Sequence, residues 1–255
     1  MSAQAAFTRL AAEDARGALV TVVAGEPLGA KLLVGPDGSR EGTLGSGGAD
    51  AAALAAAEEL MWADRSELVE YEGLSLFVDV TAPAPRLIVF GAVDYSAALA
   101  RLARAAGWLP FVSDPRTQFA TPERFPEAEE VIAAWPEETF RRLGGIDPAT
   151  YIAVLTHDPK LDDAALTIAL RSEAAYVGAM GSRRAQEHRR ERLLEAGFDV
   201  QLLDRLAAPI GLDLGAASPE ETALSIMAEV VAVRHGREGG RLVHKSGGRI
   251  HEVGA

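Results

Sequence analysis

A dense group of arginines follows an apolar run in the C-terminal half of this sequence. In "AYVGAMGSRRAQEHRRER", residues 175–192, the apolar run breaks at Gly181 and Ser182, and the next ten residues hold five arginines against two glutamates. The first N–H groups of a helix lack partners and carry partial positive charge, so they favour an anion such as phosphate. Ser182 and Arg183 would add a hydroxyl and a guanidinium, while Gly178 and Gly181 would leave room for the ligand. The pattern predicts a phosphate subsite.

The later arginines of the same stretch are expected to do something else. Arg189, Arg190 and Arg192 lie about two helical turns farther along, and charged helix faces are usually exposed. We expect these three side chains to be solvated. The alternative for the whole stretch is a solvated helix with ion pairs such as Arg183 with Glu187.

A second strand–helix turn carries an altered dinucleotide-binding pattern. The fingerprint G-x-G-x-x-G/A reads "GAVDYS" at residues 91–96. Val93 stands where the second glycine would admit a pyrophosphate, and Asp94 would either repel phosphate or cap the helix. Asp114 lies 23 residues after Gly91, near the ~20 typical of a ribose-binding acid, although an acid at a strand end also serves as a cap or turn residue. We keep Gly91 and Asp114 as cofactor-binding candidates and expect weak or absent NAD binding.

Two further segments hold candidate ligand contacts. One follows a predicted strand, and the other precedes a predicted helix. His157 in "THDPKLDD" is a candidate acid, base or ligand contact, because imidazole titrates near neutral pH; the alternative is a loop residue bonded to backbone. The aspartates of this segment have no regular ligand spacing, so no metal site is predicted. In "APIGLDLGA", residues 208–216, Gly211 would allow close backbone approach and Asp213 would contact a polar ligand edge. The alternative is a tight connection in which Asp213 caps a turn.

The composition limits the function classes. The chain has 255 residues, a formal net charge of −12 and no cysteine. The acidic balance argues against nucleic acid or a membrane surface as partner, and the lack of cysteine excludes disulfides, thiolate metal sites and cysteine nucleophiles. The N-terminus has no signal-peptide core, and no stretch approaches the ~18 apolar residues of a membrane helix. We therefore expect a cytoplasmic protein.

Two domains are expected to position these residues. The prolines of "TAPAPR", Thr81–Arg86, impose an extended linker. Before it, residues 1–82 predict a small α+β domain with strands at 17–26, 30–39 and 74–80 and a helix ending near residue 64. After it, residues 86–235 alternate helices with strands at 86–92, 109–115, 129–136, 151–158 and 175–181, which predicts a Rossmann-like doubly wound parallel sheet. Residues 236–255 are expected to form a mobile tail.

The last helix of the second domain has a clear start. Ser218 can cap it, Pro219 suits its first position, and Glu221 completes a capping box. Its apolar residues do not keep to one stripe, so the helix is expected to be buried; they are Leu224, Ile226, Met227, Val230, Val231 and Val233.

Several of these segments together resemble the XdhC/CoxI family. "YVGAMGSRR", "APIGLDLGA" and "SPEETALSIMAEVVAVR", preceded by "THDPKLD", are similar to its C-terminal Rossmann-like domain, and "GAKLLVGPDGSREGTLGSGG" is similar to its N-terminal domain. Family members are accessory proteins of molybdenum hydroxylases, such as xanthine dehydrogenase and aerobic carbon monoxide dehydrogenase. They bind molybdenum cofactor and assist its maturation and insertion. The resemblance implies this phosphate-bearing pterin as bound cargo, with Gly178, Ser182, Arg183, Gly211 and Asp213 at matching positions.

The resemblance also implies partners. These are a molybdenum hydroxylase apoenzyme and enzymes that sulfurate the cofactor or attach a nucleotide to it; a homodimer is left open. Many members carry Gly-Gly-Cys followed by a hydrophobic residue and Glu. This place reads Gly47-Gly48-Ala49-Asp50 here, so the cysteine falls on Gly48. Their Gly-Ala-Gly-His turn reads "GAVD" at 91–94. We expect a maturation factor rather than a turnover enzyme. The alternatives are an NAD(P)-dependent oxidoreductase, suggested by the sheet and Asp114, and a scaffold that only docks a partner enzyme.

Overall fold

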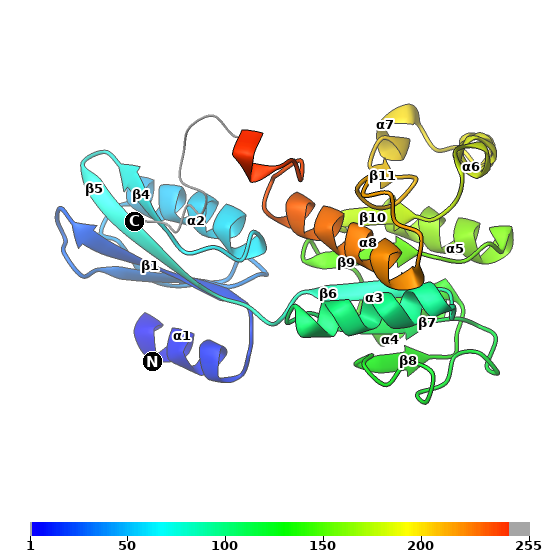
Figure 1. Cartoon of the computed structure of the whole chain (residues 1–255). Helices are drawn as coiled ribbons and strands as arrows, with labels where there is room; N and C mark the ends of the chain where they lie inside the picture. Colours follow the sequence, from blue (N-terminus) through cyan, green and yellow to red (C-terminus); the bar gives the residue numbers. More distant parts are fainter. Residues whose placement is uncertain (1, 245–255) are drawn as a thin grey trace. The chain divides into compact units, whose positions relative to one another are not determined.

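A computed structural model describes residues 2–244 of the chain. The chain divides into two compact units between Pro83 and Ala84, inside the segment predicted to be a linker. The first unit contains an antiparallel sheet and the second a parallel sheet (Figure 1). No helix among the described residues is long and apolar enough to span a bilayer.

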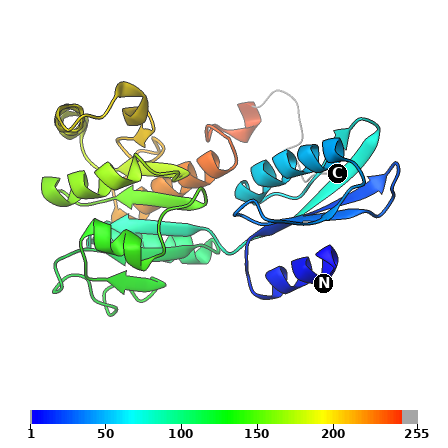
Figure 2. The ribbon, with the colours of Figure 1, turned by 180° about the vertical axis from the view of Figure 1, so that it is seen from behind.

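The sheet of the first unit has the strand order β3-β2-β1-β5-β4. The strands are β1 (Gly17–Ala24), β2 (Lys31–Val34), β3 (Arg40–Thr43), β4 (Glu67–Tyr71) and β5 (Leu74–Thr81). Helix α2 (Gly47–Trp62) covers one face and the shorter α1 (Ala3–Ala12) covers the other (Figure 2). Alternate residues of β1, namely Ala18, Val20 and Val22, are buried in one cluster with residues of α2, as expected of a two-faced strand. β3 and β4 were not predicted, since the exposed "REGT" and the half-polar "ELVEY" form a weak strand pattern.

The second unit is the predicted doubly wound parallel sheet, with strand order β11-β10-β9-β6-β7-β8. The strands are β6 (Arg86–Phe90), β7 (Leu109–Ser113), β8 (Glu130–Ile132), β9 (Thr150–Val154), β10 (Tyr176–Ala179) and β11 (Leu206–Ala207). The chain runs from β6 through β7 to the edge strand β8 and then returns to β9, on the other side of β6. The order therefore reverses between β6 and β9, the place where open α/β sheets bind ligands beyond the carboxyl ends of their strands. The two-residue β11 was not predicted.

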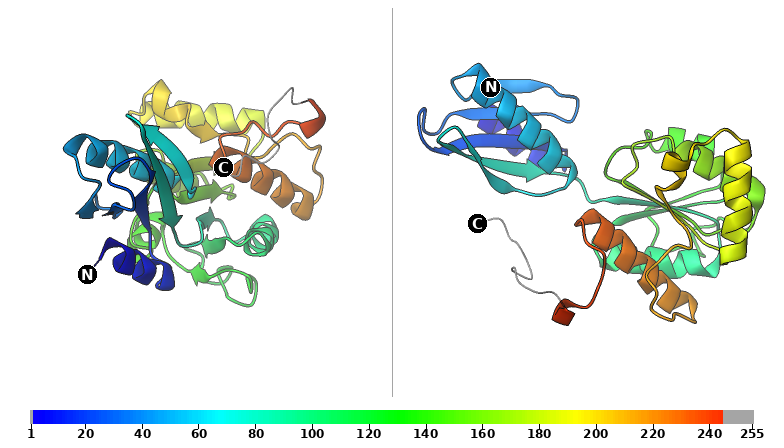
Figure 3. Two further views of the ribbon diagram at one scale, coloured as in Figure 1. Left: turned by 90° about the vertical axis from the view of Figure 1, so that its left-hand side faces the viewer. Right: turned by 90° about the horizontal axis from the view of Figure 1, so that it is seen from above.

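Helices cover both faces of the parallel sheet. They are α3 (Asp94–Ala105), α4 (Pro136–Arg142), α5 (Pro159–Ala169), α6 (Arg183–Glu195), α7 (Val200–Leu203) and α8 (Pro219–Arg234). The apolar cores show that α3 and α8 share one face, with α4, α5, α6 and α7 on the other (Figure 3). The sheet is thus buried on both sides, which explains why its strands read as continuous apolar runs.

Helix α8 begins as predicted but is only half buried. Ser218 and Glu221 form the capping box, with Pro219 in the first turn. One side of the helix packs on α3 and the sheet, while Leu224, Val231 and Val233 are 54%, 37% and 42% exposed. The expectation of a fully buried helix is wrong because α8 lies on the outside of the sheet, where a helix buries only one stripe. Of the predicted mobile tail, residues 245–255 lie outside the described part of the chain, and Leu242–His244 form a 3-10 turn.

Candidate functional site

The sequence-predicted residues lie in segments that follow the carboxyl ends of the parallel strands. Gly91 and Asp114 come directly after β6 and β7, His157 is the third residue after β9, and Gly181 to Arg183 come after β10. The segment holding Gly211 and Asp213 follows β11 and is tied to β10, since the Ile210 N–H donates to the Ala179 carbonyl at 3.1 Å. Because the strands are parallel and adjacent, these segments follow one another along one edge of the sheet.

The turn after β6 is closed by Asp114. The side chain of Asp114 is fully buried, and its Oδ2 accepts a 2.8 Å hydrogen bond from the Ala92 N–H. Arg116 donates to both carboxylate oxygens, through its backbone N–H and Nε at 2.9 Å each and through Nη2 at 2.7 Å. Burial raises the pKa of Asp114, but the hydrogen bonds from Arg116 and Ala92 outweigh it and hold the pKa below its usual value. In this structure the carboxylate holds the turn, which is the cap or turn role that the sequence left open beside ribose binding.

Gly91 is required by the packing of two strand ends. Its φ is +112°, and a Cβ at this position would lie 3.0 Å from the Thr156 backbone nitrogen. Val93, not Asp94, is the N-cap of α3, and it makes no side-chain capping bond. Of the two roles open for Asp94 in the sequence, the helix cap is not the one it takes, because Asp94 is already the first residue of α3. Its carboxylate is 89% exposed and lies 3.5 Å from the guanidinium of Arg124.

The turn after β10 leaves backbone donors available. Gly181 has φ +143°, and the Ser182 hydroxyl caps α6 by accepting from the Ala185 N–H at 3.2 Å. Within residues 2–244, the N–H groups of Arg183 and Arg184 donate to no protein acceptor. These are two of the orphan donors at the start of any α-helix. The predicted position of Ser182 at the helix start is confirmed.

A buried network supports this turn from inside the protein. Gln186 Nε2 donates to the carbonyls of Ala179 and Gly181 at 3.2 Å each. Arg189 Nη2 donates to the Met180 carbonyl at 3.0 Å and to Asp162 at 2.6 Å, and Arg189 Nη1 donates to Gln186. The carbonyl oxygens around the turn are thus occupied by side-chain donors.

The expectation of a solvated Arg189 is wrong. Its side chain is 5% exposed and forms an ion pair with the equally buried Asp162 of α5, because the two helices pack on the same face of the sheet. Asp162 Oδ1 and Arg189 Nε are buried without a hydrogen-bond partner. Burial raises the pKa of Asp162, and the attraction of Arg189 only partly offsets it. A helix-surface pattern could not reveal this pair, because it forms only when α5 and α6 pack together.

The remaining acidic residues of "THDPKLDD" also have structural partners. Asp163 accepts two hydrogen bonds from Arg192, at 2.8 and 2.9 Å, and Asp158 caps α5 by accepting from the Lys160 N–H at 2.9 Å. Among the described residues no group of three or more His, Cys, Asp or Glu could hold a metal. His157 is exposed. Of the three arginines expected to be solvated, Arg190 fits best. Its side chain is 45% exposed, and its one ion pair among the described residues, with Asp204, is long at 3.8 Å.

The comparison with protein families follows the same division of the chain. The model described as the XdhC Rossmann domain matches residues 87–230, and the model described as the XdhC and CoxI family matches residues 10–72. The chain belongs to the XdhC and CoxI family. The resemblance noted in the sequence is confirmed.

Three curated relatives match large parts of the chain. A Bacillus subtilis protein named as a probable xanthine dehydrogenase subunit is 32% identical over 160 residues, 63% of this chain and 46% of the relative. The uncharacterized protein YqeB of Escherichia coli is 26% identical over 239 residues, 88% of this chain and 44% of the relative. The molybdenum cofactor insertion chaperone PaoD of Escherichia coli is 28% identical over 152 residues, 60% of this chain and 41% of the relative. The chain thus spans less than half the length of each of these relatives.

A solved structure supports the fold. A crystal structure described as a xanthine dehydrogenase from Bacillus halodurans superposes with a TM-score of 0.63 and 24% identity, over 90% of this chain and 65% of that one. At this identity the likeness concerns the architecture alone.

Two glycines of the XdhC-type motifs are explained by contacts inside the protein. A Cβ at Gly178 would lie 2.6 Å from Ile210 and from the Tyr176 hydroxyl, and a Cβ at Gly211 would lie 2.5 Å from Ser225 Oγ. Glu229 of α8 holds the same loop, since its Oε2 accepts from the Gly211 N–H at 2.8 Å and from the Tyr176 hydroxyl. Burial and the neighbouring Glu229 raise the pKa of Tyr176. No sequence pattern pointed to Glu229, which acts from a helix on one face of the sheet.

The family's cysteine position lies at the start of α2. Ser46 caps this helix, and a Cβ at Gly48 would lie 2.8 Å from the Tyr71 hydroxyl. A side chain at position 48 therefore requires Tyr71 to move.

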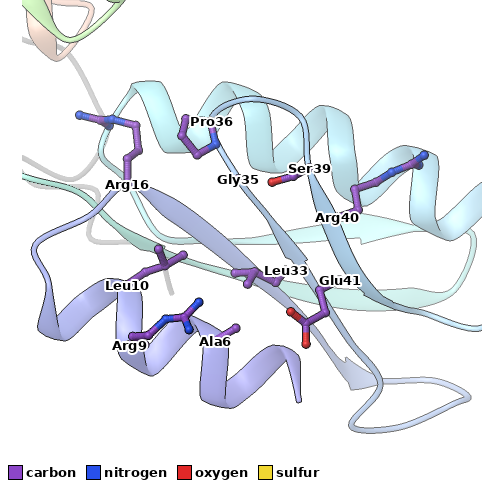
Figure 4. A pocket seen from close by; sticks show the side chains of 10 residues that line it. All are labelled: Ala6, Arg9, Leu10, Arg16, Leu33, Gly35, Pro36, Ser39, Arg40 and Glu41. Carbon is purple, nitrogen blue, oxygen red and sulfur yellow. The ribbon is translucent and has the colours of Figure 1, made fainter. Parts of the chain in front are cut away.

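The first unit of this XdhC and CoxI family member also has a cavity of about 280 Å³ between α1 and the β2–β3 hairpin. Three arginines line it, but the guanidinium groups of Arg16 and Arg40 lie at opposite ends of the lining in Figure 4. Arg16 donates to the Met61 carbonyl at 2.5 Å and stacks over Trp62. Because its charges do not converge, this cavity carries no candidate anion site.

Proposed function

We propose that this chain binds molybdenum cofactor and assists its insertion into a molybdenum hydroxylase. Membership of the XdhC and CoxI family and the similarity to a protein named a molybdenum cofactor insertion chaperone support this role. In this proposal the cofactor is cargo, and the partner is the hydroxylase apoenzyme.

The observation that carries the proposal is the open turn after β10. A phosphate-bearing pterin needs anion donors, and this turn presents the N–H groups of Arg183 and Arg184, the Ser182 hydroxyl and the Arg183 guanidinium on one helix start. Gln186 and Arg189 hold the turn in place from inside. In this chain the turn would bind and orient the phosphate of the cofactor, while Gly211 and Asp213 remain predicted contacts to the rest of it.

The oxidoreductase alternative is less favoured by the geometry. In the dinucleotide-binding fold the pyrophosphate approaches the backbone of the turn after the first strand. Here the Ala92 N–H of that turn donates to Asp114, and a carboxylate lies where a phosphate would approach.

The phosphate site can be tested by calorimetric titration of molybdopterin. Arg183→Ala should weaken binding roughly ten- to a hundredfold, the value of one charge-assisted contact. Arg190→Ala is the matched control, because Arg190 is an exposed arginine of the same helix whose ion pair with Asp204 is long, at 3.8 Å. This variant should change the affinity little. Equal losses in both variants would indicate diffuse electrostatics. No loss in Arg183→Ala would exclude this turn as the phosphate site.

The insertion role needs its own measurement. Cofactor-loaded protein should activate a molybdenum-hydroxylase apoenzyme in proportion to the cofactor supplied, faster than free cofactor does. Activation at the rate of free cofactor would contradict an insertion role while leaving cofactor binding intact.

A further inference from the structure

A cavity of about 530 Å³ lies between α4 and α5 in the second unit. Trp135, Glu137, Asp163, Thr167 and Ile168 are among the residues that line it. Trp135 and Glu137 belong to the start of α4, and Asp163, Thr167 and Ile168 belong to the middle and end of α5, so the cavity lies in the groove between these two helices, on the face of the sheet that they cover. Its volume is in the range of small-molecule sites.

Trp135 offers a planar surface to this cavity. Its side chain is exposed to 50%, whereas Trp108 is 3% exposed. Its backbone is fixed as the N-cap of α4, because its carbonyl accepts from the Thr139 N–H at 3.0 Å and from the Thr139 hydroxyl at 3.1 Å. A large apolar ring held at the rim of a cavity and left half in water is a suitable stacking surface for a planar ligand.

The two carboxylates of the cavity differ in their partners. Asp163 is bound by Arg192 through two hydrogen bonds. Glu137, in the first turn of α4, has no hydrogen-bond or ion-pair partner in the part of the chain that the structure describes. Its two oxygens are therefore available as a pair of acceptors. A carboxylate pairs best with two neighbouring donors in one plane, because both oxygens then accept together.

We propose that this cavity binds a planar heterocycle whose edge carries a ring N–H beside an amino group. The ring would stack on Trp135, and its two donors would bond to Glu137. Pterin and guanine share this edge, whereas adenine presents an acceptor beside its amino group. The pterin form of the proposal rests on the function proposed above; the guanine form does not.

Calorimetric titrations with pterin, guanosine monophosphate and adenosine monophosphate test this site. The wild-type chain should bind pterin or the guanine nucleotide and should bind the adenine nucleotide much more weakly. Trp135→Ala should weaken binding roughly ten- to a hundredfold, as loss of a stacking partner does, and Trp135→Phe should recover part of it. Glu137→Gln should weaken binding about tenfold. The matched control is Glu138→Gln, which changes the neighbouring exposed carboxylate that pairs with Arg141.

Several outcomes would overturn the proposal. The first is that the folded wild type binds neither pterin nor guanosine monophosphate. The second is that it binds adenosine monophosphate as tightly as these two. The third is that affinity is unchanged in both Trp135→Ala and Glu137→Gln. A dimer that Trp135→Ala dissociates, without heterocycle binding, would assign the surface to a second copy of the chain instead. The two proposals can be told apart. If Arg183→Ala lowers the affinity for molybdopterin and Trp135→Ala does not, the phosphate site at the start of α6 stands and the α4–α5 cavity is excluded as the site of the pterin.

Discussion

Two strand–turn–helix junctions of the parallel sheet look alike in sequence and differ in structure. After β6 and after β10 the chain turns at a glycine with positive φ, at Gly91 and Gly181, and enters a helix. At the first turn a buried acid, Asp114, accepts a backbone N–H of the turn. At the second turn Gln186 and Arg189 donate to backbone carbonyls. The first arrangement places a carboxylate on one backbone N–H of the turn, and the second places side-chain donors on backbone carbonyls. In the described part of the chain, the first two N–H groups of both helices have no protein acceptor.

The difference shows that glycine spacing alone does not make an anion site. A glycine permits the turn in both places, but the side chains behind it differ. At the first turn a carboxylate occupies one backbone donor, and at the second turn side-chain donors occupy backbone carbonyls. Both charged groups are themselves paired, Asp114 with Arg116 and Arg189 with Asp162.

The largest expected effect comes from removing the cation behind the second turn. Arg189→Ala should lower the free energy of unfolding by about 3–5 kcal/mol, because it leaves the buried carboxylate of Asp162 without its partner. Urea denaturation measures the change. Arg192→Ala is the control, since its ion pair with Asp163 is about one-third exposed, and should cost less than about 1 kcal/mol.

A similar small loss in both variants would mean that Asp162 becomes neutral in the native protein at little cost. Replacing both Asp162 and Arg189 with apolar residues of similar size should recover most of the stability lost in Arg189→Ala.

A smaller effect is expected from neutralising the acid behind the first turn. Asp114→Asn should destabilise the fold by about 2 kcal/mol, because Arg116 and the Ala92 N–H lose a charged acceptor. The lowered pKa of Asp114 means that its contribution is present above the unfolded value of ~3.9 and is lost as pH falls through the folded pKa. The variant should therefore show a smaller acid loss of stability than the wild type. Parallel pH profiles in thermal denaturation would contradict this assignment.

The smallest expected effect is a null result at the first turn. Titration of NAD or NADP should give little heat, because Asp114 occupies the Ala92 N–H and Val93 fills the place of the second glycine. A micromolar affinity that disappears in a folded Gly91 variant would remove the contrast between the two turns and favour an oxidoreductase.

The parallel sheet could be predicted well from the sequence because its strands are buried on both sides and read as unbroken apolar runs. The start of α6 at Ser182 and the capping box of α8 were also readable, since capping depends on residues three positions apart. The pairing of Arg189 with Asp162 joins residues 27 positions apart and arises only when α5 and α6 pack together. For the same reason no sequence pattern could decide between the two roles of Asp114 or point to Glu229.

The contact between position 48 and Tyr71 in the first unit decides what a thiol at this helix start would require. Because a Cβ at Gly48 would meet the Tyr71 hydroxyl at 2.8 Å, a side chain at 48 and an unmoved tyrosine at 71 exclude each other. Gly48→Cys alone would have to displace the ring of Tyr71, whereas Gly48→Cys with Tyr71→Phe would remove the obstructing oxygen. A reactive thiol can therefore be introduced at the start of α2 with less disturbance in the double variant than in the single one.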